Sequence, residues 1–149
     1  MTTIIATPSA MYSDSNVVDG TSVFKAQKIY LIRGKLVGCA GDNPMVFYFL
    51  DAFRRGTKRV RMSAEQKVAI PESDRDFSAL IVDDQGIWHL GSDFTADLVQ
   101  EPFMAVGSGG DAARGALMAG ATPEQAIEIA CQIDSDSRGP VQVLQLKGE

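Results

Sequence analysis

Most of the chain consists of short apolar runs separated by turn-forming residues, a pattern that predicts strands joined in hairpins. A proline marks the turn Thr7-Pro8-Ser9, Arg33-Gly34 is a two-residue hairpin signal, and Asp83 to Gly86 forms a further turn. The strands predicted from these runs cover residues 2–6, 10–15, 28–32, 35–40, 78–82, 86–90, 103–107 and 141–146.

The apolar spacing changes to that of a helix in three places. Asn43 is a good N-cap and Pro44 a good first helical residue, and a helix is expected from there to Gly56. A small-residue helix is expected over Asp111–Met118, and Thr122 with Gln125 forms the capping box of the next. The residues predicted to face the core are Val46, Phe49, Leu50 and Phe53 in the first helix, and Ala126, Ile129, Ala130 and Ile133 in the last.

The order of these elements indicates the fold class. Four strands, a helix, three strands, two helices and a strand favour antiparallel sheets with helices packed outside them, an α+β fold, over a wound parallel sheet. Residues 57–77 are polar and charged and are expected to form a long loop, with a short helix near Ala64–Val68 left open. At 149 residues, the chain is expected to form one domain over 1–149 with a substantial core.

Composition excludes several classes of function. The formal net charge is −5, so a nucleic-acid partner is not expected. No apolar stretch reaches the roughly 18 residues of a membrane span, and the start lacks the layout of a signal peptide, which makes a cytoplasmic setting the expectation. The one basic cluster is expected to be a solvated loop. It comprises Arg54, Arg55, Lys58, Arg59 and Arg61.

Cysteine and histidine provide no metal site in the sequence. Cys39 and Cys131 lie far apart without CxxC spacing, so neither a disulfide framework nor a zinc motif is predicted. His89, beside Trp88, has no neighbouring ligand and is expected to be a residue at the edge of a strand. The chain is therefore expected to need no metal and no cofactor.

Thr2 is the first candidate for chemistry. Removal of Met1 would leave a threonine with a hydroxyl and a free α-amine at the start of a rigid strand. The amine can take the proton of the hydroxyl, so one residue supplies both nucleophile and base. Such a site needs a cation that lowers the pKa of the amine, a carboxylate that orients the cation, and backbone N–H groups that face an oxyanion.

Candidates for these three helpers follow along the chain. Asp14 ends the second predicted strand and Lys28 begins the third, where neighbouring strand ends can meet. Without Thr2, the simpler interpretation is a turn-forming aspartate and a solvent-facing lysine. Gly41 precedes the first helix and can present an unobstructed N–H group, or it is only a turn glycine at a junction.

Two polar segments near the end of the chain leave their roles open. Gly107-Ser108-Gly109-Gly110 resembles a phosphate-binding turn, yet it lacks the P-loop and dinucleotide patterns, so Ser108 is either a helix cap or a hydroxyl aimed at a nearby site. The segment Asp134 to Ser137 is a cation site, a polar turn, or a proton relay between its first and last residues. It has too few oxygen ligands for an EF-hand loop.

Taken together, these segments resemble the proteasome β-subunit family of threonine peptidases, which are N-terminal nucleophile (Ntn) hydrolases, and most closely the bacterial HslV type. The resemblance covers nearly the whole chain. It lies in Thr2 to Ala6, Asp14-Ser15 with Gly20 following, Ala26 to Ile29, Gly38 to Gly41, Val106 to Gly110 with its helix, and Asp134 to Gly139. The fold that it implies is a four-layer α-β-β-α sandwich with two packed antiparallel sheets.

The resemblance also implies roles for residues of this chain. Thr2 would be nucleophile and, through its amine, base; Asp14 and Lys28 would form the supporting ion pair; and the Gly41 N–H would stabilise the oxyanion. The remaining implied roles are hydrogen bonding around the amine by Ser108, Asp134 and Ser137, and lining of the substrate pocket by Val18, Gly20 and Cys39.

This chain departs from the family pattern at several places. It is shorter between Phe53 and Phe77, where the family has a second long helix that contributes to contacts between rings. Tyr12 and Ser13 replace the small residues before the aspartate, and Arg138 interrupts a Ser-Gly-Gly run, which is expected to narrow the site. A retained Met1 would turn the Thr2 amine into an amide and remove the base.

The function predicted first is that of a threonine endopeptidase subunit in a self-compartmentalising, homo-oligomeric ring, acting on peptides or unfolded proteins. Whether an ATP-dependent unfoldase delivers the substrate is left open. The alternatives are a catalytically silent ring protein of the same fold, a small-molecule amidase on that fold, and a phosphate-binding module at Ser108.

Overall fold

The computed structural model describes residues 2–56, 69–135 and 137–146. The elements before the gap are β1 (Ile4–Thr7), β2 (Ala10–Ser13), β3 (Asn16–Asp19), β4 (Ser22–Lys25), β5 (Ile29–Ile32), β6 (Lys35–Gly41) and α1 (Asn43–Arg54). Those after it are the 3-10 turn η1 (Glu72–Asp74), β7 (Phe77–Asp83), β8 (Gly86–Leu90), β9 (Ala96–Leu98), β10 (Met104–Val106), α3 (Gly110–Met118), α4 (Pro123–Ile133) and β11 (Gln142–Gln145).

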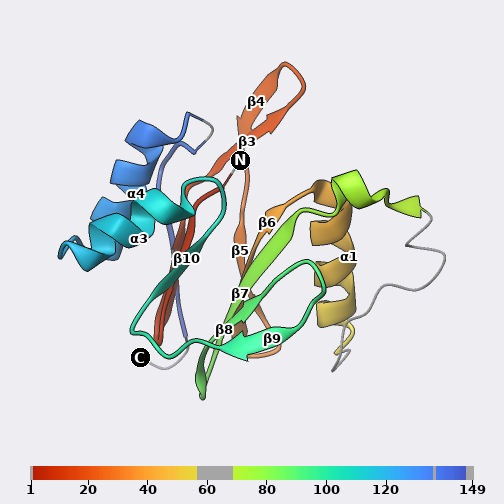
Figure 1. The fold of residues 1–149 in the computed structure, drawn as a ribbon, viewed down its shortest axis with the longest axis horizontal. Coiled ribbons are helices and arrows are strands. Elements are labelled where there is room, and N and C mark those ends of the chain that lie inside the picture. The colour runs from red at the N-terminus through yellow and green to blue at the C-terminus, as the bar shows by residue number, and fades with distance from the viewer. Residues whose placement is uncertain (1, 57–68, 136, 147–149) are drawn as a thin grey trace.

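The strands form two main sheets, and the strand pairings in the described residues are antiparallel. The first sheet has the order β10-β1-β2-β11 and the second the order β5-β6-β7-β8-β9. Strands β3 and β4 pair only with each other in a hairpin that projects from the body (Figure 1). The predicted antiparallel sheets are therefore confirmed.

The helices cover the outer faces of the two sheets. Figure 1 shows α3 and α4 beside the first sheet and α1 on the far side of the second. Successive side chains of strand β6 point to opposite faces of the second sheet and so belong to two different cores. Val37 and Cys39 pack in the core under α1, whereas Leu36 and Ala40 pack between the sheets. A third core lies between the first sheet and α3 with α4. The fold is the four-layer α-β-β-α sandwich that the resemblance implies.

The hairpin predicted at Arg33-Gly34 and the capping box predicted at Thr122 are both confirmed. Arg33 and Gly34 both have positive φ values, 54° and 77°, which is the backbone that a two-residue hairpin turn between β5 and β6 requires. The Thr122 hydroxyl accepts from the Gln125 N–H and the Gln125 side chain accepts from the Thr122 N–H, so α4 begins with a complete capping box.

Other details of the helices are corrected by the structure. The N-cap of α1 is Asp42, not Asn43, which is already helical. Residues Arg54 and Arg55, predicted in a solvated loop, lie at the end of α1, where Arg54 stacks on the Tyr30 ring and Arg55 pairs with Asp51. The short helix considered near 64–68 lies outside the described residues.

The core-facing side of α4 was predicted correctly for Ala126 and Ala130 but wrongly for Ile129 and Ile133. Ala126, Ile127 and Ala130 are buried in α4, whereas Ile129 and Ile133 are 37% and 70% exposed. The buried face is rotated because α4 packs against both α3 and the first sheet, so it is not set by the apolar spacing alone. In α1, Met45 is buried in addition to Phe49 and Leu50.

The predicted element order lacked three short strands, β3, β4 and β9. All four residues of β4 and all three of β9 are exposed, so neither strand has the alternating apolar and polar residues from which a strand is predicted.

In the described ranges, no helix is both long enough and apolar enough to cross a membrane.

Candidate active site

Hydrogen bonds from two other segments fix the backbone of Thr2 and Thr3, just before β1. Asp14 Oδ1 accepts the Thr3 N–H at 3.0 Å, and the Asp14 N–H donates to the Thr3 carbonyl at 3.2 Å. The Gly109 N–H donates to the Thr2 carbonyl at 3.4 Å from the other side. Thr3 itself is fully buried, so Thr2 lies where the chain leaves the core.

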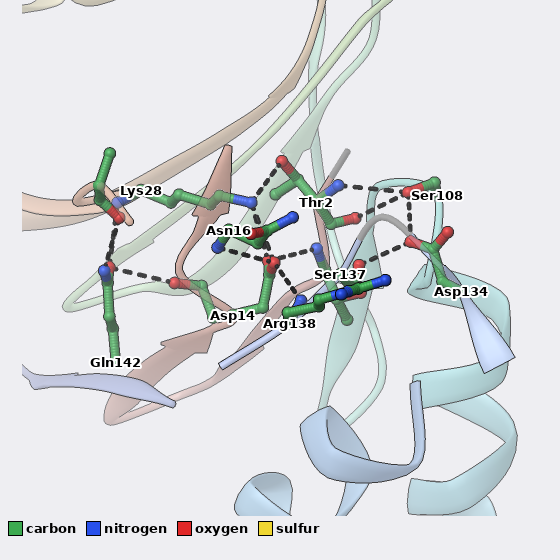
Figure 2. A network of polar contacts seen from close by, with 12 residues as sticks. Thr2, Asp14, Asn16, Lys28, Ser108, Asp134, Ser137, Arg138 and Gln142 are labelled. Atoms are coloured by element: carbon green, nitrogen blue, oxygen red, sulfur yellow. Dashed lines mark hydrogen bonds and ion pairs between the residues drawn. The ribbon is translucent and has the colours of Figure 1, made fainter. Parts of the chain in front are cut away.

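Thr2, Lys28 and Asp14 form one connected group (Figure 2). Lys28 Nζ lies 3.2 Å from Thr2 Oγ1 and 3.1 and 3.0 Å from the two carboxylate oxygens of Asp14. The aspartate is fully buried and the lysine is 7% exposed. The structure thus brings a cation and its carboxylate to the threonine hydroxyl, and the simpler interpretation of Asp14 and Lys28 as a turn former and a solvent-facing strand end is wrong.

Backbone groups complete the surroundings of the Asp14 carboxylate. Besides the Thr3 N–H, it accepts the Asn16 N–H at 3.2 Å and the Arg138 N–H at 3.0 Å. These fixed donors, together with Lys28, allow a charged carboxylate to remain in the core. Burial lowers the pKa of Lys28 below its ordinary value, and the neighbouring Asp14 charge opposes that shift.

A second chain of hydroxyls meets Thr2 at its backbone nitrogen. The Thr2 N–H donates to Ser108 Oγ at 3.2 Å, and the Ser108 hydroxyl donates to Asp134 Oδ2 at 2.5 Å. Ser137 donates to the same oxygen at 2.6 Å and lies 2.8 Å from Thr3 Oγ1. Of the roles left open, the geometry favours a hydrogen-bonded pair of Asp134 and Ser137 that reaches the nitrogen of Thr2 through Ser108.

The glycines around Ser108 are explained by their contact with the start of β1. Gly107 has a φ of +98°, and a Cβ there would lie 2.0 Å from the Thr2 carbonyl oxygen. A Cβ on Gly109 would lie 2.0 Å from Thr3 Oγ1. The N-cap of α3 is Gly109, without a side-chain cap bond, so Ser108 is not a helix cap. Close approach of two backbones accounts for this glycine run without a phosphate ligand.

Gly41 lies where the two cavities beside Thr2 meet. The lysine-side cavity, of about 400 Å³, is lined by Thr2 and Gly41 together with Lys28 and Tyr30 among others. The serine-side cavity, of about 320 Å³, is lined by Thr2 and Gly41 together with Ser108 and others. The φ of Gly41 is +130°, and a Cβ there would lie 2.2 Å from the Asp76 carbonyl oxygen, so only glycine fits this position.

Two of the three predicted pocket residues line the lysine-side cavity. Val18 and Cys39 are among its lining residues. Burial raises the pKa of the Cys39 thiol far above its ordinary value, so it lines the cavity as a neutral group. Gly20 does not line either described cavity; it has a φ of +60° and forms the turn between β3 and β4. Arg138 is exposed and lines neither cavity, so the expectation that it narrows the site is wrong.

Gln142 was not among the residues predicted for the site. Its side-chain oxygen accepts the Lys28 N–H at 3.0 Å and the Ser13 hydroxyl at 3.3 Å, and its amide nitrogen donates to the Ala26 carbonyl at 2.7 Å. These contacts tie the backbone that carries Lys28 to β2 and β11. No local pattern in the alternating run of the last strand sets this glutamine apart.

Histidine and cysteine take no part in a metal site in the part of the chain that the structure describes. No group of three His, Cys, Asp or Glu residues there could hold a metal ion, and Cys39 and Cys131 are free thiols. His89 lies in β8 and pairs with Leu80 and Asp97 of the two neighbouring strands, so it is a strand residue, as expected, but one inside the second sheet.

Neither a protein-family model nor a curated protein matches the sequence. Eukaryotic HslV from Trypanosoma brucei is similar in structure, with a TM-score of 0.71, 19% identity, and coverage of 98% of this chain and 99% of that one. BPH from Thiobacillus denitrificans has a TM-score of 0.70, 19% identity and 99% coverage of both chains. Its complex with epoxomicin gives a TM-score of 0.67, 18% identity and 99% coverage of both. The shared fold is that of HslV-like Ntn hydrolases.

Proposed function

We propose that this chain is a threonine endopeptidase subunit whose nucleophile is Thr2, exposed by removal of Met1. The observation that carries the proposal is the 3.2 Å separation between Lys28 Nζ and Thr2 Oγ1, with the ammonium held by the buried carboxylate of Asp14. A cation beside the hydroxyl favours its deprotonated form, and a free amine on the same residue supplies the base. The fold shared with HslV and with BPH, which has been seen with epoxomicin, supports the same chemistry.

The reaction divides into two steps. Thr2 Oγ1 attacks the carbonyl carbon while its proton passes to the α-amine, and the N–H of Gly41 donates to the oxyanion that forms. The C–N bond then breaks, the ammonium of Thr2 returns the proton to the departing amine, and an ester on Thr2 remains. Water then gives a proton to the same amine and attacks the ester carbonyl. As the acid leaves, the Thr2 ammonium returns that proton to Oγ1, which restores the free hydroxyl and the neutral amine.

Ser108, Asp134 and Ser137 orient the amine in this proposal. Ser108 Oγ lies 3.2 Å from the Thr2 nitrogen, and its hydroxyl donates a hydrogen bond to the Asp134 carboxylate. The carboxylate accepts from Ser137 as well, so its position does not depend on Ser108 alone. A fixed acceptor beside the amine keeps its lone pair directed at the hydroxyl.

The test is to measure the intact mass of the purified protein before and after incubation with epoxomicin. We expect a mass without Met1 and an added mass of one inhibitor, absent in Thr2→Ala and retained in the surface variant Thr21→Ala. Peptide hydrolysis should follow the same pattern. A protein that lacks Met1 yet neither reacts nor hydrolyses peptides would be the silent ring protein, and hydrolysis of small amides alone would make it an amidase.

The assembly is part of the same proposal. We infer a homo-oligomeric ring in the cytoplasm that encloses the sites, with peptides or unfolded proteins as substrates and an unfoldase as an optional partner. Large apolar side chains on the outer helices support a self-associating surface, since Phe47, Met118 and Ile133 are 70% exposed or more. Sedimentation should give a single species of several subunits, and a monomer would contradict this part.

A further inference from the structure

Two cavities meet at Thr2 and differ in their far walls. Thr2, Ala40, Gly41 and Asp42 line both. The lysine-side cavity continues to the apolar or neutral side chains of Tyr30, Cys39 and Val46, whereas the serine-side cavity continues to Asp76, Ser78 and Ser108. A substrate whose carbonyl lies at Thr2 places its acyl part in one cavity and its leaving amine in the other.

The position of the Thr2 nitrogen indicates which cavity takes the leaving amine, given the proposed function on which this inference rests. The proton carried by the Thr2 amine must be given to the departing nitrogen, so the leaving group lies on the amine's side of the hydroxyl. That amine is 3.2 Å from Ser108 Oγ, which lines only the serine-side cavity. Lys28, which contacts the hydroxyl, lines only the lysine-side cavity.

The two cavities also differ in charge. The lysine-side cavity is lined by one carboxylate, Asp42, and by the Lys28 ammonium, which is itself paired with Asp14. The serine-side cavity has the carboxylates of Asp42 and Asp76, two serine hydroxyls and, among its described lining residues, no lysine, arginine or histidine. Its acceptors and its charge therefore suit a cation.

We propose that the serine-side cavity binds the residue immediately after the scissile bond and selects a lysine or arginine there. Its volume of about 320 Å³ accommodates a long side chain. The new ammonium formed on the leaving fragment is itself positive, so the same two carboxylates also stabilise the product amine as it departs.

Asp76 is the residue through which this selection can be tested. Its backbone fixes Asp42, which lines both cavities: the Asp76 carbonyl accepts the Asp42 N–H at 2.7 Å, and the Asp76 N–H donates to Asp42 Oδ2 at 2.9 Å. Neither bond uses the Asp76 side chain, which is exposed. Asp76→Asn therefore removes the charge and keeps the backbone contacts, whereas a change at Asp42 would remove one of them.

The experiment compares peptides that share one acyl part and carry Arg, Gln or Glu after the scissile bond. We expect kcat/KM in the order Arg, Gln, Glu, with about a fivefold step for Arg over Gln, the size expected from one exposed ion pair. Asp76→Asn should reduce the Arg-to-Gln ratio severalfold. The control Asp84→Asn, at the opposite end of β7, should leave the ratio unchanged. The ratio in the unmodified protein should also fall with added salt.

The outcomes separate this inference from the proposed function. Hydrolysis by Thr2 with equal rates for the three peptides, or an Arg preference that Asp76→Asn leaves intact, would overturn the inference and leave the peptidase in place. Absence of both hydrolysis and epoxomicin labelling would overturn both.

Discussion

At the scale of single residues, the site depends on a buried ion pair that stability alone does not explain. Asp14 is fully buried and Lys28 is 7% exposed, and moving two such charges out of water costs several kcal/mol each before pairing offsets it. Three backbone N–H groups from three segments are aimed at the same carboxylate. So many fixed donors around one charge are expected where a cation must be held at a defined atom, here Thr2 Oγ1.

Replacing Lys28 should affect both activity and stability. Lys28→Met leaves Asp14 charged and unpaired, so we expect the free energy of unfolding to fall by about 3 kcal/mol and hydrolysis to fall at least about a hundredfold. Urea unfolding and a peptide assay at a temperature where the variant is folded measure the two effects. Lys35→Met is the control, because the Lys35 side chain is 46% exposed and its ion pair with Asp83 is 3.9 Å long. A stable Lys28→Met with normal turnover would rule out the role proposed for the pair.

The pH dependence of hydrolysis should show the lowered pKa of Lys28. Burial, the larger effect, favours the neutral amine, and the proposed reaction needs the charged form, so the rate should fall on the alkaline side below the ordinary lysine value of 10.5. Lys28→Arg, which stays charged, should lose that decline if it is active. For stability the sign is opposite: between the folded pKa and 10.5 the unfolded chain binds more protons, so this group's contribution rises with pH. A decline in rate centred above 10.5 would contradict the prediction.

At the scale of elements, the turn between β10 and α3 positions the start of β1. The Gly109 N–H holds the Thr2 carbonyl, and Gly107 and Gly109 leave no room for a Cβ against Thr2 and Thr3. Thr3 cannot move away easily, because its hydroxyl is buried against Ser137. The distance between Thr2 and its helpers is therefore set by how closely this turn packs on the strand.

Adding one methyl group in this turn should displace Thr2. In Gly109→Ala the new Cβ meets Thr3 Oγ1 at 2.0 Å and the Ala130 Cβ at 3.2 Å, so we expect a loss of about 1–3 kcal/mol of stability and a larger loss of epoxomicin labelling. Gly115→Ala is the matched control, since a Cβ there in α3 meets nothing within 4 Å and should stabilise the helix by about 0.5–1 kcal/mol. Thermal unfolding and labelling rates measure both. Equal labelling of the two variants would refute the positioning role.

At the scale of the whole molecule, the distance between the two sheets decides where Lys28 meets Thr2. Thr2 precedes β1 in the first sheet and Lys28 precedes β5 in the second, so the site lies where the two layers face each other. At Gly38 in β6, side chains of the first sheet pack directly against the backbone of the second sheet. A Cβ there would lie 2.9 Å from Ile4 Cγ2 and from Met11 Sδ.

Forcing the sheets apart at Gly38 should destabilise the fold and weaken the site together. Gly38→Ala adds a methyl group to a filled core, which costs about 1–3 kcal/mol. The double variant Gly38→Ala with Met11→Val removes the sulfur that the methyl group meets, so its loss should be smaller than the sum of the two single losses. Chemical denaturation of the four proteins measures this. Additive losses would show that the sheets are not in contact through Gly38.

Local sequence was enough to predict the parts of this protein whose signals lie within a few residues. The hairpins, the capping box of α4 and the candidacy of Thr2 as a nucleophile could all be predicted. Each depends on neighbouring residues only: the residues of a turn, the residues of a helix cap, or a hydroxyl and an amine on one residue. The strands β3, β4 and β9 could not be predicted. They are short and largely exposed, so their pairing depends on hydrogen bonds to a neighbour and leaves no pattern of burial.

The sequence by itself determined the order of the helices and of the strands that contribute to the core, the alternation that divides β6 between two cores, and the residue types available for chemistry. Only the tertiary structure decided that Ile127 and not Ile129 faces the core, that Gln142 holds Lys28, and that Gly20 lies away from the cavities. It also decided which charges line which side of Thr2. Some of these features join residues more than a hundred positions apart in the sequence. Only the packing of the two sheets and their helices brings such residues into contact.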